Sequence, residues 1–394
     1  MTRVLRCSGY DVTEKEIVRA RGCTLVAADG RRYVDFESGV WAAGLGHNHP
    51  RINRAIAAQL ERISHIGYRV TNSVVEEAAA TVLDTLALSD GKCVFLSSGS
   101  EAVEFAVQIA RRITGKPLLL TLADSYLAAY GSAGRKSAEE WICFDWGACR
   151  ACPQARECSG GCPHLAGIPV DRVGGLVFEP GSSGGCVRFP PAKLVRALRD
   201  SVRDRGGLVL ANEVTTGMGR TGAWYGFEHY DLRPDIVALG KGLGNGYPVS
   251  AVAMTDAVVD RLTEVGFRYA QSHQNDPLGC AVAKEVIAII REEGLVRRSA
   301  DMGARFLGGL RPLAERHDAV GEVRGRGLML AMEFVADDGG NSLALTFNEL
   351  LASGFLVGYK PAARLLRFFP PLTIGEREIS DLVERLDRIL DGLS

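Results

Sequence analysis

One lysine of the chain lies where a charge is costly. Lys241 directly follows the apolar run 236–239 and stands among glycines, in the sequence GKGLGNG. Burying an ammonium group costs free energy unless the group is paired or chemically converted. One such conversion is an imine with an aldehyde cofactor, which makes the lysine a covalent catalyst. The alternative is a lysine on a surface loop, and this stretch alone does not decide between the two.

A serine-rich turn is the second stretch that suggests chemistry. Residues 97–100 read SSGS, between a short predicted strand at 94–96 and a long predicted helix. Free backbone N–H groups and the dipole at a helix start favour a bound anion, and serine hydroxyls add donors. Two interpretations are open: the turn is either a phosphate cradle or an ordinary capping box of the Ser-x-x-Glu type.

Four cysteines are spaced like metal ligands. The chain has ten cysteines, of which Cys149, Cys152, Cys158 and Cys162 form the pattern C-x2-C-x5-C-x3-C. Without a secretory signal, such a cluster favours a metal site over disulfides. Four sulfur ligands suit either an iron–sulfur cluster or Zn²⁺, and a cluster without metal is the third possibility.

The elements around these residues predict an α/β fold. Strands and helices alternate through the middle of the chain, which indicates a mostly parallel sheet covered by helices on both faces. Tyr126, Glu179 and Asn212 follow or close predicted strands. Ligands bind such sheets at the carboxyl ends of strands. We therefore expect these three side chains, the serine turn and Lys241 to share one pocket.

Two domains are predicted. Asp29-Gly30 between two short apolar runs predicts a hairpin near the N-terminus. The tail, with a strand near 323–335 and an amphipathic helix at 376–391, is typical of a smaller α+β domain. The predicted boundaries are 1–45 for the N-terminal part of the small domain, 46–290 for the large domain with a Cys-rich insert at 140–166, and 291–394 for the C-terminal part of the small domain.

Composition excludes several classes of protein. The net charge of the 394 residues is −1, so no general attraction to nucleic acid or to an anionic membrane follows. No apolar run approaches the ~18 residues of a membrane span. The first residues lack the apolar stretch of a signal peptide, so we expect a cytoplasmic protein.

Six stretches together resemble the class III aminotransferases, which are pyridoxal 5'-phosphate (PLP) enzymes of fold type I. In chain order they read DFESGVWAAGLGHNHP, SSGSEAVEFAVQIAR, NEVTTGMGRTG, GKGLGNGYPVSAV, SHQNDPLGCAVA and LLRFFPPLTI. The resemblance covers nearly the whole length. It implies PLP as cofactor and a homodimer with both active sites at the subunit interface. It also implies transfer of an amino group between a primary amine or amino acid and a keto acid or aldehyde.

The resemblance assigns roles to residues of this sequence. Lys241 would form the imine with PLP and move protons between the substrate and the cofactor. Gly99 and Ser100 would bind the phosphate, and Ser272 would reach the phosphate of the partner subunit. Tyr126 would stack on the pyridine ring.

Two more roles follow from the same resemblance. Glu179 would lie beneath the ring region in a supporting role. Arg367 is the candidate for binding a substrate carboxylate, because its planar fork suits two oxygens; the alternative is a structural arginine.

Several positions depart from the family pattern. Asn212 stands where the family has an aspartate that keeps the pyridine nitrogen protonated, which would weaken the ring as an electron sink. The glutamate that commonly pairs with the carboxylate-binding arginine aligns near Gly184, so we expect Arg367 to lack an acidic partner. The runner-up function is a PLP-dependent lyase, decarboxylase or epimerase. A weakly active, cluster-bearing partner protein is a further alternative.

The cysteine motif is the largest departure. With Gly160-Gly161 before its last cysteine, it resembles the auxiliary-cluster motif of SPASM domains, which binds [4Fe–4S]. That resemblance implies metal binding at Cys149, Cys152, Cys158 and Cys162, with zinc as the alternative. The insert would then serve as a structural staple or as a docking surface for a partner protein or a peptide substrate.

Overall fold

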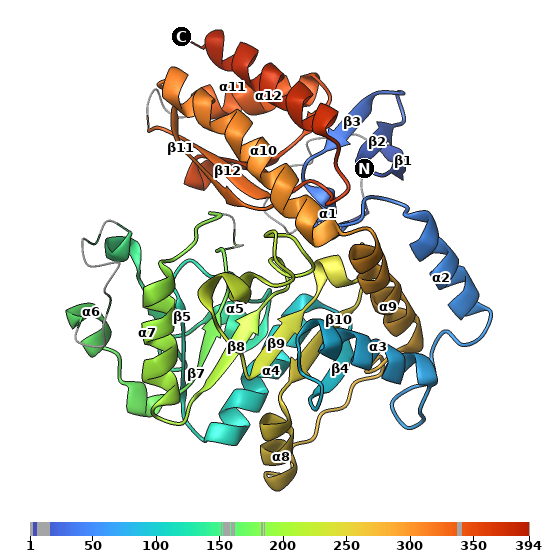
Figure 1. The fold of residues 1–394 in the computed structure, drawn as a ribbon, viewed down its shortest axis with the longest axis vertical. Coiled ribbons are helices and arrows are strands. Elements are labelled where there is room, and N and C mark those ends of the chain that lie inside the picture. The colour runs from blue at the N-terminus through green and yellow to red at the C-terminus, as the bar shows by residue number, and fades with distance from the viewer. Residues whose placement is uncertain are drawn as a thin grey trace.

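The computed structural model describes residues 3–5, 16–150, 152, 158, 162–182, 184, 186–336 and 341–393. The described strands form three sheets, of seven, four and four strands. Figure 1 shows the seven-stranded sheet in the lower half of the molecule and the two smaller sheets above it, near the C-terminus. Segments from both ends of the chain therefore meet above the large sheet.

The large sheet has the strand order β4-β10-β9-β8-β7-β5-β6, and all strands run parallel except β10, which is antiparallel to β4 and β9. Most of these strands are buried along their full length, which explains why they appear as apolar runs rather than alternating patterns. The predicted α/β fold with a mostly parallel sheet is confirmed. The strand bounds are β4 Lys92–Leu96, β5 Leu118–Leu122, β6 Trp141–Phe144, β7 Val173–Phe178, β8 Leu208–Asn212, β9 Ile236–Leu239 and β10 Ser250–Met254.

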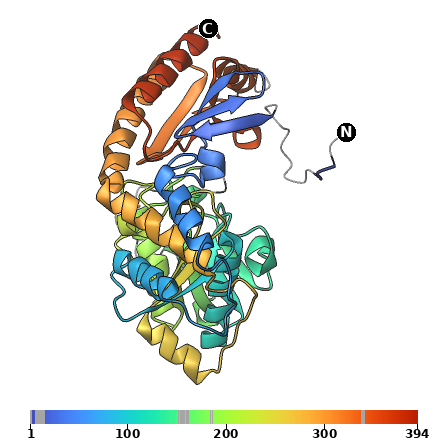
Figure 2. The same ribbon diagram turned by 90° about the vertical axis from the view of Figure 1, so that its right-hand side faces the viewer.

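Helices cover both faces of the large sheet (Figures 1 and 2). One apolar cluster joins α4 (Gly99–Thr114) and α8 (Asp256–Glu264) to one face. A second cluster contains α3 (Ser73–Thr85), α7 (Ala192–Arg203) and α9 (Pro277–Glu292) on the other, and α2 (Pro50–Leu60) packs against α9. Helices thus pack on both faces of the sheet, which leaves its strand ends as the positions for a site.

The two smaller sheets form the upper part of the molecule in Figure 1. One contains β11 (Val320–Arg326), β12 (Met329–Phe334), β15 (Leu365–Phe368) and β14 (Gly358–Lys360). The other contains β1 (Ile17–Arg21), β2 (Thr24–Ala27), β3 (Arg32–Asp35) and β13 (Phe355–Leu356), and β13 lies parallel to β3. The helices of this part are α10 (Leu295–Arg316), α11 (Asn341–Ala352) and α12 (Glu376–Asp391).

Comparison with the predicted elements gives one confirmation and one correction. The hairpin around Asp29 and Gly30 is confirmed, because β2 and β3 pair antiparallel. The single strand predicted near 323–335 is wrong. A turn at Gly327, where φ is +52°, divides it into β11 and β12, and this glycine lies so close to the backbone of residues 220–222 that no side chain fits. The predicted insert at 140–166 begins with β6, the edge strand of the large sheet.

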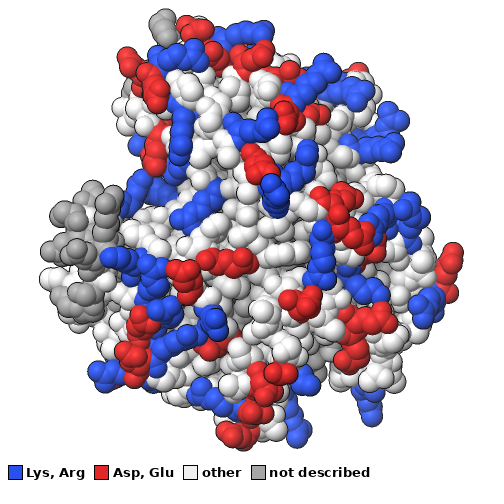
Figure 3. Space-filling view, in the orientation of Figure 1, with Lys and Arg blue, Asp and Glu red and all other residues white. Residues whose placement is uncertain are grey.

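The surface charge and the lengths of the helices can be compared with the net charge of −1 and the short apolar runs of the sequence. In the view of Figure 3, Lys and Arg side chains are interspersed with Asp and Glu. Among the described residues, none of the helices combines the length and the apolar composition that a membrane crossing requires.

Candidate active site

Lys241 lies directly beyond the end of β9, in a turn where its φ is +40°. Its Nζ donates a hydrogen bond to Thr215 Oγ1 at 2.7 Å and lies 4.6 Å from the centre of the Trp41 ring. Burial lowers the pKa of Lys241 to about 8, although the nearby Glu179 carboxylate opposes this effect. An amine that is partly neutral near pH 7 is suited to attack a carbonyl group.

Glu179 and Asn212 meet between the ends of β7 and β8. Both side chains are buried, and Asn212 Nδ2 donates to Glu179 Oε2 at 3.0 Å. Asn212 Oδ1 in turn accepts from the backbone N–H of Val214 at 3.2 Å. The Glu179 carboxylate also accepts the backbone N–H groups of Tyr126 and Leu127, at 3.4 and 3.3 Å. The structure therefore brings three of the predicted strand-end residues together.

The serine turn begins α4 close to the same pair of strands. Ser98 is the N-cap, and its hydroxyl accepts from the N–H of Glu101 at 3.2 Å, so the serine half of the predicted capping box is present. The Glu101 carboxylate accepts from the N–H of Ser97, at 3.0 Å, and not from that of Ser98. A Cβ on Gly99 would come within 2.5 Å of Val214 Cγ1, and a Cβ on Gly240 would lie 3.2 Å from Gly99 Cα. The first turn of a helix offers N–H groups without intrahelical partners, so capping does not exclude an anion here.

Arg367 on β15 reaches the site from the upper part of the molecule. Its Cζ lies 4.8 Å from the centre of the Trp41 ring, on which Lys241 also lies. The expectation that Arg367 lacks an acidic partner is wrong, because its Nη2 lies 3.7 Å from Glu37 Oε2. Burial raises the pKa of Glu37 to about 7, and Arg367 opposes that shift. Arg367 Nε and Glu37 Oε1 are buried without a hydrogen-bond partner among the described residues.

A left-handed turn at α1 (Ser38–Trp41) positions Glu37 and Trp41. Its four residues have φ values between +46° and +69°, which is unusual for residues other than glycine. The buried Asp35 carboxylate holds this turn, because it accepts the N–H groups of Glu37 and Gly39 at 2.7 and 3.1 Å. The sequence analysis did not identify Glu37, since its partner Arg367 lies 330 residues further along the chain.

Three predicted binding residues lie at the margin of this group. Tyr126 has 49% of its side chain exposed, although its backbone contacts Glu179. Ser100 Oγ accepts the N–H of Ala129 at 2.9 Å. Ser272 is exposed in the loop that precedes α9. The roles that the resemblance gave to these residues stay predictions.

The four cysteines of the motif are near one another. Burial raises the pKa of Cys149, and the thiols of Cys158, Cys162 and Cys152 add to that shift. Burial, Cys162 and Cys152 likewise raise the pKa of Cys158. The described cysteines form no disulfide. Residues 151, 153–157 and 159–161, which separate them, lie outside the described part of the chain.

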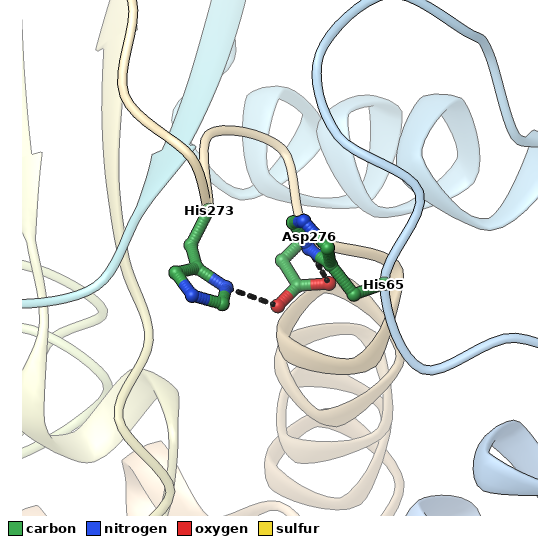
Figure 4. Close-up of side chains that lie close together, drawn as sticks. All are labelled: His65, His273 and Asp276. Atoms are coloured by element: carbon green, nitrogen blue, oxygen red, sulfur yellow. Dashed lines mark hydrogen bonds and ion pairs between the residues drawn. The ribbon is translucent and has the colours of Figure 1, made fainter.

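A further group of possible metal ligands lies close to Ser272 in the sequence. Figure 4 shows the side chains of His65 and His273 on either side of the Asp276 carboxylate. The distances from their Nδ1 atoms to the carboxylate oxygens are 3.5 and 3.2 Å, respectively. The sequence analysis gave these residues no role.

Comparisons with known proteins agree with this arrangement. Residues 8–127 and 164–390 match the family model described as aminotransferase class-III. The acetylornithine aminotransferase of Methanothermobacter thermautotrophicus is 30% identical, over 95% of this chain and 93% of that protein. The taurine–pyruvate aminotransferase of Rhodobacter capsulatus is also 30% identical, over 98% and 93%. A leucine/methionine racemase of Thermococcus litoralis is 28% identical, over 95% and 90%.

A solved structure supports the same assignment. The PLP-bound amine transaminase from an uncultivated Pseudomonas species superposes with a TM-score of 0.88 at 26% identity, over 100% of this chain and 99% of that one. The match extends over the large sheet and both smaller sheets, so the fold is that of a fold type I PLP transaminase. The chain therefore belongs to the class III aminotransferase family.

Proposed function

We propose that this PLP-dependent aminotransferase uses Lys241 as its catalytic residue. When bound, PLP supplies an aldehyde that condenses with amines and a ring that withdraws electrons from the neighbouring carbon. The observation that carries the proposal is the position of Lys241 directly after β9, with its Nζ hydrogen-bonded to Thr215 Oγ1, beside the strand that ends at Asn212 and next to the start of α4. The lowered pKa of Lys241, about 8, agrees with this role. In its neutral form Lys241 can take a proton from the substrate carbon and return it.

The residues present fit the cofactor. The start of α4 offers N–H donors to a phosphate, and the close contact between Gly99 and Val214 leaves no room for a side chain there. We propose that Gly99 and Ser100 bind the phosphate together with the partner subunit's Ser272. Tyr126 would cover the ring, Glu179 would lie beneath the ring region in a supporting role, and Asn212 would lie at the ring nitrogen.

Arg367 is the proposed site for a substrate carboxylate. The guanidinium is buried beside Trp41, and its Nε has no hydrogen-bond partner among the described residues. A carboxylate that entered would compete with Glu37 for it. The substrates are then an amino acid or primary amine and a keto acid or aldehyde. The lyase, decarboxylase and epimerase alternatives are not favoured, because most of the relatives are named aminotransferases.

The test is formation of pyridoxamine phosphate from an amine donor by the PLP-loaded protein. We expect Lys241→Ala to abolish both this product and the absorption band of the lysine-linked cofactor. A Lys284→Ala variant, which removes an exposed lysine paired with Glu77, is the control and should retain both. Turnover of amines by the Lys241→Ala variant would refute the role of this lysine.

For the cysteine motif we propose a [4Fe–4S] cluster bound by Cys149, Cys152, Cys158 and Cys162, with zinc as the alternative. The family model does not match residues 128–163, which contain the motif. The spacing of the four cysteines, with Gly160-Gly161 before the last one, is the feature that favours the iron–sulfur cluster over zinc.

Anaerobic purification followed by metal analysis and one absorption spectrum tests this proposal. Iron near four atoms per chain supports the cluster, zinc alone supports a structural knuckle, and neither metal refutes both. Cys158→Ser should lose the metal, whereas Cys280→Ser, on the buried helix α9, should keep it. A cytoplasmic location, a homodimer and a docking role of the insert for a peptide or partner protein also remain proposals.

A further inference from the structure

We propose that Glu179 fixes the amide of Asn212 so that the ring nitrogen of PLP meets an N–H donor and stays unprotonated. The inference rests on the proposed binding of PLP at this site and deepens it. It makes Glu179 a positioning residue, because Glu179 acts on the ring through Asn212.

Two neighbours decide the orientation of the Asn212 amide. The backbone N–H of Val214 lies 3.2 Å from Oδ1, and Glu179 Oε2 lies 3.0 Å from Nδ2. If the oxygen and nitrogen of the amide were exchanged, Nδ2 would face the N–H of Val214 and Oδ1 would face the Glu179 carboxylate. Neither of these pairs can form a hydrogen bond. Asn212 and Glu179 are only 4% and 2% exposed, so water cannot compensate for such a mismatch. The orientation therefore follows from the chemistry of its partners.

Glu179 acts as an acceptor toward three hydrogen-bond donors. Its two oxygens receive the N–H groups of Tyr126 and Leu127 in addition to the Asn212 amide. A carboxylate only accepts hydrogen bonds, so it holds the NH2 group of Asn212 and not the oxygen.

The Asn212 amide has one N–H hydrogen that is not used by Glu179 or Val214. Asn212 Oδ1 serves the N–H of Val214, and one hydrogen of Nδ2 serves Glu179, so the second hydrogen of Nδ2 is what Asn212 presents to a ligand. An unprotonated pyridine nitrogen has a lone pair, so it can accept a hydrogen bond from this N–H group. A pyridinium would direct its own N–H against it, and a neutral amide supplies no charge to hold the extra proton. The unprotonated ring therefore withdraws electron density less strongly. Removal of the proton from the substrate carbon then depends more on Lys241.

The test reads the ring nitrogen directly. The protein is loaded with PLP that carries ¹⁵N in the pyridine ring, and its ¹⁵N resonance is recorded at neutral pH. We expect the resonance of an unprotonated pyridine in the native protein and the resonance of a pyridinium in Asn212→Asp. Asn72→Asp, at the N-cap of α3, makes the same chemical change away from the site and should leave the resonance unchanged.

Glu179→Gln tests the positioning role. A glutamine both donates and accepts, so the Asn212 amide can turn, and we expect a ring nitrogen that is partly protonated at neutral pH. An unchanged resonance with only weaker PLP binding would mean a structural role and overturn the inference. A pyridinium resonance in the native protein would overturn it as well, while the lysine-linked cofactor band would leave the proposed function standing. A protein that shows neither the band nor bound PLP would overturn both.

Discussion

Trp41 lies close to both cations of the site. Lys241 Nζ and Arg367 Cζ lie 4.6 and 4.8 Å from the centre of its ring. A cation over an indole ring is stabilised by about 0.5–2 kcal/mol, and the larger values apply to desolvated positions. The same arrangement lets Arg367 contribute to the lowered pKa of Lys241, after the larger effect of burial. The ring and Glu37 together make it possible to keep two cations in one buried site.

The lowered pKa of Lys241 predicts how fast the apo-protein takes up PLP. Only the neutral amine attacks the aldehyde, and its fraction rises with pH through the pKa. A shift from 10.5 to about 8 gives roughly 300-fold more neutral amine near pH 7 than an exposed lysine has. Stopped-flow absorbance should show an uptake rate that rises with pH and levels off above about 8. A rate that still rises toward pH 10 would contradict the burial of this amine.

The Glu37–Arg367 pair predicts a change in substrate affinity. Replacing Glu37 by glutamine removes the competing anion, so KM for a carboxylate-bearing substrate should fall about fivefold, or ~1 kcal/mol. Below its pKa of about 7 the native Glu37 is itself neutral, so the two proteins should converge as the pH falls and differ most above it. The measurement is KM against pH for an amino acid substrate.

The control for this prediction is Glu322→Gln. Glu322 pairs with Arg150 and Arg324 on a partly exposed surface, and its loss should leave KM unchanged at every pH. A KM that increases in Glu37→Gln, or that differs from the native value equally at all pH values, would show that Glu37 holds Arg367 in its binding position and does not compete with the substrate.

At the residue scale, the sequence predicted the groups that lie at strand ends but not the groups that meet across the chain. The pairing of Glu179 with Asn212 agrees with the prediction that strand ends converge, because adjacent parallel strands end at one edge. Glu37 contacts Arg367 only after β3 and β15 are both in place, and neither local propensity nor spacing encodes that contact.

At the scale of elements, the start of α4 shows how a strand–turn–helix unit makes a binding site. The N-cap Ser98 orders the first turn, and the absence of a side chain at Gly99 lets the helix start approach Val214 beside β8. A single Cβ at this position would push the helix start away from the strand ends.

Gly99→Ala tests that geometry. The added Cβ would lie 2.5 Å from Val214 Cγ1, so the helix start has to move and the phosphate donors move with it. We expect PLP affinity to fall about tenfold or more, which is ~1.4 kcal/mol, with the fold retained. Gly308→Ala in α10 is the matched control, because an added Cβ there meets no atom within 4 Å. Unchanged PLP affinity in Gly99→Ala would mean that the phosphate binds elsewhere.

Most helices and strands were predictable from periodicity and turn residues. The turn at α1 was not, because its left-handed φ of +60° at Val40 is unfavourable for a β-branched residue. It persists through the hydrogen bonds that the Asp35 carboxylate accepts from the backbone of Glu37 and Gly39, in the loop after β3. The split between β11 and β12 was also missed, because the close backbone approach at Gly327 involves the loop after β8.

At the scale of the whole molecule, the active site draws on three parts of the chain. Glu37 and Trp41 come from the N-terminal segment, Lys241 and Asn212 from the large sheet, and Arg367 from β15. A relative movement of the upper and lower parts would therefore change the distance between the candidate carboxylate site and Lys241. This separation of roles suits an enzyme that must admit and release different substrates in turn.

The predicted homodimer can be tested at this scale. In each active site, the partner subunit's Ser272 is expected to contact the phosphate of PLP. Lys241→Ala removes the catalytic amine, and Ser272→Asp sets a negative charge against the phosphate; each protein alone should be inactive or nearly so. When the two are unfolded, mixed and refolded together, half of the dimers should be mixed. Each mixed dimer has one intact site, so activity should return to about a quarter of the native value. Mixed dimers without activity would show that Ser272 serves its own subunit, whereas full activity of the Ser272→Asp protein alone would show that Ser272 has no role at the phosphate. Size-exclusion chromatography of the native protein decides whether a dimer exists at all.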